Sequence, residues 1–191
     1  KGFSQPEILR VHRAVMNALD DPKKIGAWRL APVYVVNVLP GGRERIVYTP
    51  PKATGVSRLI DDLLRWLDAN DDVHPIIRAG LFHYQFETIH PFTDGNGRTG
   101  RLLALLHLYQ SGWDFKKILV LEDFYNQNRK AYYEALQTGG TYQSRQKADL
   151  SNWLNYYVNG FLAEAKKVRD QVLSLSTLKT SVTRNILDRD E

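Results

Sequence analysis

Residues 90–101 bring a histidine, a carboxylate, a glycine-rich turn and two arginines into twelve consecutive positions. His90 opens the stretch, Asp94 follows it, and Arg98 and Arg101 come after the turn at residues 95–97. An imidazole can act as a general base near neutral pH. A single carboxylate can hold Mg²⁺ when phosphates and water complete the shell, and guanidinium groups pair with phosphate oxygens. These residue types together indicate proton transfer beside a bound phosphate group.

The turn formed by Gly95, Asn96 and Gly97 should open a helix, because apolar residues follow it with helical spacing. Those residues are Leu102, Leu103, Leu105, Leu106 and Leu108. Backbone N–H groups of such a turn point into one concavity, and the positive end of the helix dipole adds to its attraction for anions. Arg98 and Arg101 share a face at that end, where positive charge is unfavourable unless an anion binds. A simple cap with solvated arginines is the alternative, but base, carboxylate, turn and arginine pair together favour phosphate binding.

The stretch resembles, at every defined position, the signature of the Fic (filamentation induced by cAMP) family, H-P-F-x-[DE]-G-N-G-R-x-x-R. The resemblance implies a mainly α Fic fold, a helical bundle with a small β-hairpin flap beside the active-site loop. It implies Mg-ATP-dependent transfer of AMP to a Tyr, Thr or Ser hydroxyl of a target protein, with release of pyrophosphate. His90 would then remove the hydroxyl proton, and Asp94 would hold Mg²⁺ between the α- and β-phosphates. The implied phosphate-binding groups are Gly95, Asn96 with its side chain, Gly97, Arg98 and Arg101.

Two positions separate branches of that family. The related Doc branch, which the resemblance implies is a kinase, has Lys where this chain has Gly97. A branch that transfers phosphocholine has Ala where this chain has Gly95. AMP transfer is therefore favoured over transfer of another phosphate-containing group. A regulatory or DNA-associated binding module with a vestigial loop is the remaining alternative, and the intact His90, Asp94 and arginine pair weigh against it.

Composition narrows the class of protein. With 191 residues, 43% of them hydrophobic, the chain is long enough to bury the core of a single domain. The net charge of +5 is spread along the chain with no long basic block, so nucleic-acid binding is disfavoured. The absence of cysteine excludes disulfides and thiolate metal sites. No apolar run is long enough for a membrane span, so we expect a cytoplasmic protein; a secreted effector would look the same.

The first third of the chain predicts a helix and then a hairpin. Apolar spacing predicts an amphipathic helix over residues 6–19, and extended runs on both sides of a Pro-Gly-Gly turn predict a β-hairpin over residues 33–48. A small sheet that only covers the core is one interpretation of the hairpin. The Fic resemblance instead implies that Val47, Tyr48 and Thr49 belong to a flap on which an extended target segment docks by strand addition.

Two further helices are predicted before the motif, and the second of them should form a helical hairpin with the helix after the motif, gripping the loop from both sides. Strong amphipathic spacing predicts one over residues 56–67, and a broad apolar face predicts a buried helix over residues 75–87 that runs into the motif. Phe92 should be buried and fix the direction of His90. His83 and His107 lie on apolar helices and are expected to be core histidines, not metal ligands. His12 and His74 carry no signal.

The last third predicts a short extended or loop segment at residues 118–121, a helix over residues 124–136 and a core helix over residues 153–161 that reaches residue 168. Aromatic spacing alone favours a core role for the second of these. The Fic resemblance instead implies that Tyr133 and Leu136 line the adenine end of the nucleotide pocket. Residues 174–177 are predicted to be a linker. We expect residues 25–170 to form the catalytic domain, with residues 1–24 an N-terminal helix that follows an inhibitory segment and residues 171–191 a C-terminal linker or helix.

Regulation is expected to act on Arg101. Many Fic proteins carry an inhibitory helix with the pattern [ST]-x-x-x-E-[GN], whose Glu pairs with the second motif arginine, and no Ser or Thr of this chain has Glu four residues on. The inhibitory element would therefore lie upstream or come from a partner antitoxin. Without it, Arg101 should be free to bind ATP and the domain constitutively competent.

Overall fold

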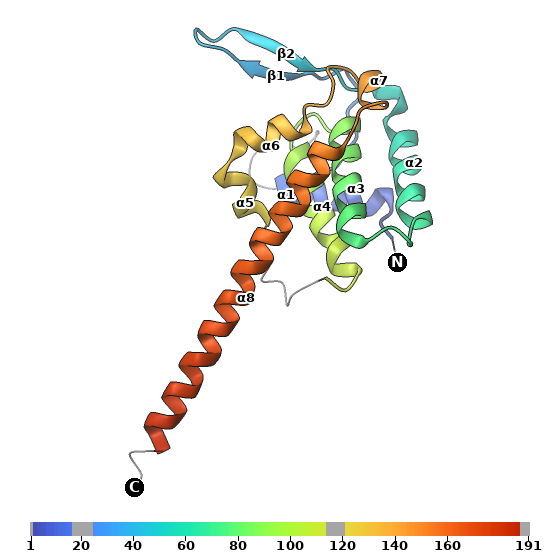
Figure 1. Ribbon diagram of the computed structural model, residues 1–191. Helices are drawn as coiled ribbons and strands as arrows, with labels where there is room; N and C mark the ends of the chain where they lie inside the picture. Colours follow the sequence, from blue (N-terminus) through green and yellow to red (C-terminus); the bar gives the residue numbers. More distant parts are fainter. Residues whose placement is uncertain (1, 17–24, 114–120, 188–191) are drawn as a thin grey trace.

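The computed structural model describes residues 2–16, 25–113 and 121–187, with side chains to residue 175. It is mainly α-helical, and Figure 1 shows a bundle of helices with a two-stranded hairpin projecting from one end. The predicted fold class is confirmed. The helices that build the bundle are α1 (Gln5–Met16), α2 (Val56–Ala69), α3 (Pro75–Ile89), α4 (Asn96–Gln110), α5 (Leu121–Gln127), α6 (Arg129–Leu136), α7 (Tyr142–Arg145) and α8 (Ser151–Leu187).

The helices α3 and α4 form the helical hairpin that grips the motif loop, as predicted. Pro75 stands in the first turn of α3, where its missing N–H and fixed φ are favourable, and the His74 side chain accepts a hydrogen bond from the Ile76 N–H. The helix ends at Ile89 and is capped by His90, whose φ of 51° is left-handed. The next helix starts after Gly95, which has φ 75°. The loop between them is therefore a tight connection that turns at both ends.

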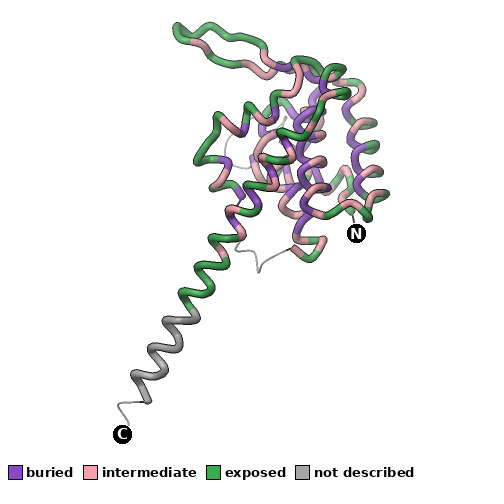
Figure 2. Tube along the Cα trace, viewed as in Figure 1, coloured by how far each residue is buried: buried purple, intermediate pink, exposed green. Residues whose placement is uncertain are grey.

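The flap is an antiparallel hairpin of β1 (Val35–Val38) and β2 (Glu44–Tyr48), as predicted. Gly41 and Gly42 take positive φ in its turn, which explains the paired glycines. The pairing is irregular between Val35 and Val36. A short 3-10 helix, η1 (Ala53–Gly55), then leads into α2. The tip of the hairpin is largely exposed, whereas its base joins the body of the protein (Figure 2).

The helix predicted over residues 124–136 is wrong in one respect, because the structure has two helices there. Asn128 interrupts them with φ −141° and ψ 69°, and its side chain accepts a hydrogen bond from the Ala131 N–H as the N-cap of α6. Asparagine is favoured at such caps because it satisfies an orphan N–H. Of the predicted extended segment, residues 118–120 lie outside the described residues, and Leu121 instead begins α5.

The linker predicted at residues 174–177 is also wrong, since α8 continues through it to Leu187. Neither proline nor glycine interrupts the stretch. The Ser174 hydroxyl donates to the Asp170 carbonyl at 2.9 Å, a bond that lets serine remain inside a helix. Figures 1 and 2 show α8 leaving the bundle as its buried residues give way to exposed ones.

Two apolar clusters form the core on either side of the α3–α4 hairpin. The first packs α1 and α2 against this hairpin and includes Phe92. The second packs α5, α6 and α8 against it and includes Trp153, whose indole N–H donates to the Gly80 carbonyl at 2.8 Å. Both helices that hold the motif loop are thus fixed from two sides.

Candidate functional site

His90 caps α3 and presents its ring to a cavity. Its N–H donates to the Phe86 carbonyl at 2.9 Å, and its Nδ1 lies 3.3 Å from the Glu87 carbonyl oxygen. That contact leaves Nε2 as the ring nitrogen for proton transfer. Burial lowers the pKa of His90 to about 4, so the ring is neutral at pH 7, as a general base must be.

Phe92 and Asn96 lock the loop. Phe92 is fully buried, which confirms the burial predicted for it. The Phe92 N–H donates to Asn96 Oδ1 at 2.8 Å, and Asn96 Nδ2 donates to the Phe92 carbonyl at 2.9 Å. The amide of Asn96 is thus already engaged within the loop, so a phosphate role for this side chain stays a prediction. Its backbone N–H, in the first turn of α4, has no partner inside the helix.

His12, for which the sequence predicts no role, contacts the same loop from α1. Its ring stacks on Phe92 with centroids 3.6 Å apart, and its Nε2 lies 3.0 Å from the Asp94 carbonyl oxygen. Its Nδ1 accepts a hydrogen bond from the Gly26 N–H at 2.9 Å. Gly95 fits against this support because a Cβ there would lie 2.5 Å from Met16 Sδ. His12 therefore contacts the loop from outside and is not among the residues that line the cavity described below.

Asp94 has the properties expected of a magnesium ligand. Its side chain is 68% exposed, and its Oδ2 lies 3.3 Å from Arg98 Nη2. Its Oδ1 accepts the Gly95 N–H at 2.6 Å. The described residues hold no ready-made cluster of three or more metal-ligating side chains. One exposed carboxylate beside the N-terminal turn of α4 nevertheless fits the way Mg²⁺ is usually bound.

Arg101 is not free, so that prediction is wrong. Its Nε and Nη2 donate to the two carboxylate oxygens of Glu122 at 2.6 and 2.9 Å, a bidentate pair. Glu122 lies in the first turn of α5, where the helix dipole favours negative charge. The guanidinium also lies 5.7 Å from the centre of the Tyr132 ring. Constitutive competence stays a prediction, because the pair is partly exposed and a phosphate could replace the carboxylate.

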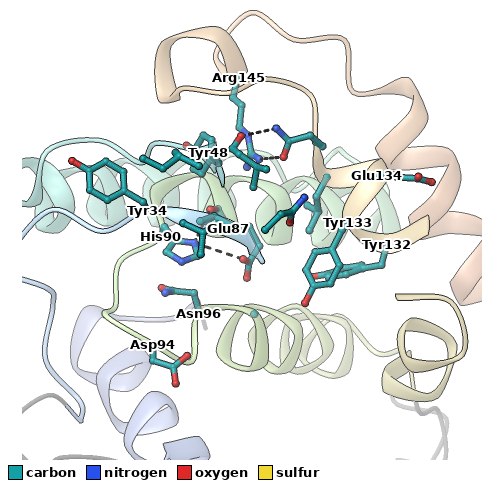
Figure 3. Close-up of a pocket in the computed structure, with 18 of the residues that line it drawn as sticks. Tyr34, Tyr48, Glu87, His90, Asp94, Asn96, Tyr132, Tyr133, Glu134 and Arg145 are labelled. Carbon is teal, nitrogen blue, oxygen red and sulfur yellow. Dashed lines mark hydrogen bonds and ion pairs between the residues drawn. The ribbon is translucent and has the colours of Figure 1, made fainter. Parts of the chain in front are cut away.

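The motif residues and parts of the flap and of α6 line one cavity of about 1090 Å³. Figure 3 shows His90, Asp94 and Asn96 on one side of it, with Tyr132 and Tyr133 of α6 on another. All of the predicted site residues line the cavity except Thr49. Tyr133 is 61% exposed and Leu136 is buried, so one ring and one apolar side chain border the space predicted for adenine.

The base of the flap is joined to the body of the protein by hydrogen bonds. Tyr48 is buried, and its hydroxyl donates to the Thr88 carbonyl at 2.5 Å. The Thr49 N–H donates to the Gly140 carbonyl, and its own carbonyl accepts from the Tyr142 N–H. The Val47 carbonyl accepts from Gln137 Nε2 at 2.8 Å. Strand addition by a target would therefore use main-chain groups nearer the tip of the hairpin.

Two buried charged residues of the cavity wall, Arg145 and Glu87, were not predicted. Arg145 comes from α7, with its guanidinium carbon 3.6 Å from the centre of the Tyr48 ring, and nothing in the sequence links these two positions. Glu87 is buried one helical turn before His90. An acidic residue on the buried face of an apolar helix is a signal that could have identified it.

His83 and His107 are core histidines, as expected. His83 is fully buried with its Nε2 3.1 Å from the Tyr132 hydroxyl, and burial lowers its pKa to about 3. His107 Nε2 accepts a hydrogen bond from Arg78 Nε at 3.1 Å. In the part of the chain that the structure describes, none of the helices is long and apolar enough to cross a membrane.

Comparisons with known proteins agree with this architecture. A family model described as Fic/DOC family matches residues 2–108. Protein adenylyltransferase fic-1 of Caenorhabditis elegans is 38% identical over 138 residues, which cover 70% of this chain and 23% of the relative. Protein adenylyltransferase Fic of Culex quinquefasciatus is 35% identical, over 69% of this chain and 23% of the relative. The chain thus spans about a quarter of the length of these relatives. A crystal structure of a Fic family protein from Desulfovibrio desulfuricans G20 superposes with a TM-score of 0.68 and 29% identity, over 90% of this chain and 47% of that one.

Proposed function

This chain belongs to the Fic/DOC family, and from that premise we propose that it transfers AMP from ATP to a hydroxyl side chain of a target protein. The observation that carries the proposal is the convergence, in one cavity, of His90, whose pKa burial lowers, and the N-terminal turn of α4 with its two arginines. The names of the adenylyltransferase relatives support the same reaction.

In the proposed mechanism the protein positions the reactants and supplies the base. His90 Nε2 removes the proton of the target hydroxyl as its oxygen attacks the α-phosphorus. The backbone at residues 95–97 and the two motif arginines hold the phosphates. Asp94 would hold Mg²⁺, which when bound neutralises charge that develops on the pyrophosphate. Tyr133 and Leu136 would hold adenine, and the outer part of the flap would dock the target segment.

Label transfer tests the reaction directly. The domain would be incubated with a host lysate, Mg²⁺ and ATP labelled on either the α- or the γ-phosphate. We expect protein labelling from the α-labelled nucleotide only, whereas labelling from γ would indicate a kinase. Stabilisation by duplex DNA without stabilisation by Mg-ATP in a thermal unfolding assay would favour the binding module.

Replacing Asp94 with asparagine should lower transfer by about 10- to 100-fold at a fixed Mg²⁺ concentration, because a metal contact is worth several kcal/mol. The rate should recover partly as Mg²⁺ is raised. A magnesium titration of the transfer rate measures this. Asp72→Asn, which changes an exposed carboxylate in the turn before α3, is the matched control and should behave as wild type. If the transfer rate of the Asp94 variant depended on Mg²⁺ concentration in the same way as that of wild type, Asp94 would not be a magnesium ligand.

Replacing Glu122 with glutamine should lower the KM for ATP by about 3- to 10-fold, since the partner that occupies Arg101 is then neutral. ATP titrations of the transfer rate and of nucleotide binding measure the effect. Asp123→Asn is the control, because this neighbour is also in the first turn of α5 and is exposed. An unchanged or raised KM would mean that Glu122 does not compete with phosphate for Arg101.

A further inference from the structure

Glu87 is a buried carboxylate inside the proposed active site. It lies on α3, one helical turn before His90, and contributes to the cavity wall. Figure 3 shows its side chain directed toward the His90 ring. Burying a carboxylate is costly unless it has hydrogen-bond or ionic partners, so its place beside the catalytic base calls for a physical reason.

The contacts of Glu87 centre on one nitrogen. Its Oε2 lies 3.9 Å from His90 Nδ1, and its carbonyl oxygen lies 3.3 Å from the same atom. Its Oε1 is buried with no hydrogen-bond partner among the described residues. Glu87 thus faces the side of the imidazole opposite to Nε2, the nitrogen proposed to take the proton.

Other charged and titratable groups surround this carboxylate without forming hydrogen bonds to it among the described residues. They are His83 and His90 of α3, Arg101 of α4, Tyr132 of α6 and Arg145 of α7. Each arginine has a nearer partner: Arg101 pairs with Glu122, and Arg145 donates to the Gly139 carbonyl at 3.1 Å. Close packing against α4 also holds Glu87 in place, because a Cβ on Gly100 would lie 2.9 Å from its Oε1.

We propose that Glu87 is a positioning residue of the transfer reaction, the anionic partner that stabilises His90 when its imidazole becomes positively charged. The inference rests on the proposed function. The oxygen of the target hydroxyl forms a bond to the α-phosphorus, the bond from that phosphorus to the pyrophosphate oxygen breaks, and the hydroxyl proton moves to His90 Nε2. Throughout this step the Glu87 carbonyl keeps a proton on Nδ1, and the Glu87 carboxylate faces the new charge.

The proposal has a consequence for pH. Burial raises the pKa of Glu87 to about 7, and the charges of Arg101 and Arg145 oppose that rise. Its anionic form is therefore present above pH 7 and is lost as the pH falls through 7. His90 stays neutral over this range because its pKa lies near 4. The transfer rate should thus fall below pH 7 through Glu87, well before His90 itself is protonated.

The kinetic test compares three variants. Glu87→Gln keeps the shape but removes the charge; we expect kcat at pH 8 to fall by about 10- to 100-fold, with the KM for ATP changed by less than about twofold. In this variant, the transfer rate should no longer fall as the pH is lowered through 7. Glu87→Asp keeps the charge and should restore part of kcat together with the pH dependence. Glu164→Gln, which changes a buried carboxylate on α8 outside the cavity, is the matched control and should match wild type.

A second measurement does not depend on transfer. In the ATP-free protein, the ring nitrogen shifts of His90, assigned by NMR with the His90→Ala variant, should change with an inflection near pH 7 that Glu87→Gln lacks. Transfer by wild type with an unchanged kcat and pH profile in Glu87→Gln would overturn the inference but leave the proposed function standing. A lower kcat that keeps the inflection of the rate near pH 7 would also overturn it. No transfer of α-label by wild type would instead refute the proposed function, and the NMR inflection alone would then decide whether Glu87 and His90 are partners.

Discussion

Replacing His90 with alanine should lower AMP transfer by about 100- to 10,000-fold, the range that a positioned general base contributes. Its ring is neutral at pH 7 because burial lowers its pKa to about 4, and its Nδ1 is held at the Glu87 carbonyl. His90 lies before the turn at residues 95–97 that is proposed to bind the phosphates and is not part of that turn. The affinity for Mg-ATP should therefore change little. Single-turnover transfer from α-labelled ATP gives the rate, and equilibrium binding of the nucleotide gives the affinity.

The comparison between rate and affinity decides what His90 does. A fall in rate at constant affinity is expected of a group that acts only in the transition state. An equal loss of affinity would show that the side chain supports binding, and label transfer that survives the substitution would refute the mechanism. His74→Ala, which removes the N-cap of α3 outside the cavity, should leave the rate unchanged.

The elements around the motif could be predicted because their signals are local. Apolar periodicity marks α2 and α3, the glycine turn marks the start of α4, and the Pro-Gly-Gly turn marks the hairpin. Asn128 divides one predicted helix in two, because its local cap interrupts an otherwise continuous apolar pattern. The opposite error occurs near residue 174, where serines that were predicted to form a linker do not end α8.

The site itself could be predicted only in part, because part of it depends on contacts between distant residues. His90 and Asp94 belong to one short motif, but Glu122 reaches Arg101 from 21 residues further along the chain. His12 touches the loop across 82 residues, and its sequence context on α1 gives no sign of this. Such pairings depend on how helices pack, which spacing within one helix does not reveal.

The largest effect on stability is expected at Phe92, two residues after His90, because its ring is fully buried. Phe92→Ala should lower the free energy of unfolding by about 3–5 kcal/mol, the usual cost of truncating a fully buried phenylalanine. That is a large share of the 5–15 kcal/mol typical of a folded domain. Urea unfolding measures the change. Leu30→Ala removes an apolar side chain that is 95% exposed, and this control should alter stability by no more than about 0.5 kcal/mol.

Phe92→Ala should also lower the transfer rate, because the motif loop packs against the Phe92 ring. Its ring stacks on His12 with centroids 3.6 Å apart and on Trp28 with centroids 5.1 Å apart, while the Asn96 side chain accepts a hydrogen bond from its backbone N–H. A cavity in this place frees the segment between His90 and Asp94 to shift, and small displacements of a base cost much of its rate. Phe92→Leu refills most of the space and should restore both stability and transfer. If Phe92→Ala unfolded at the wild-type urea concentration, the loop would be held by the Asn96 hydrogen bonds and not by burial of the ring.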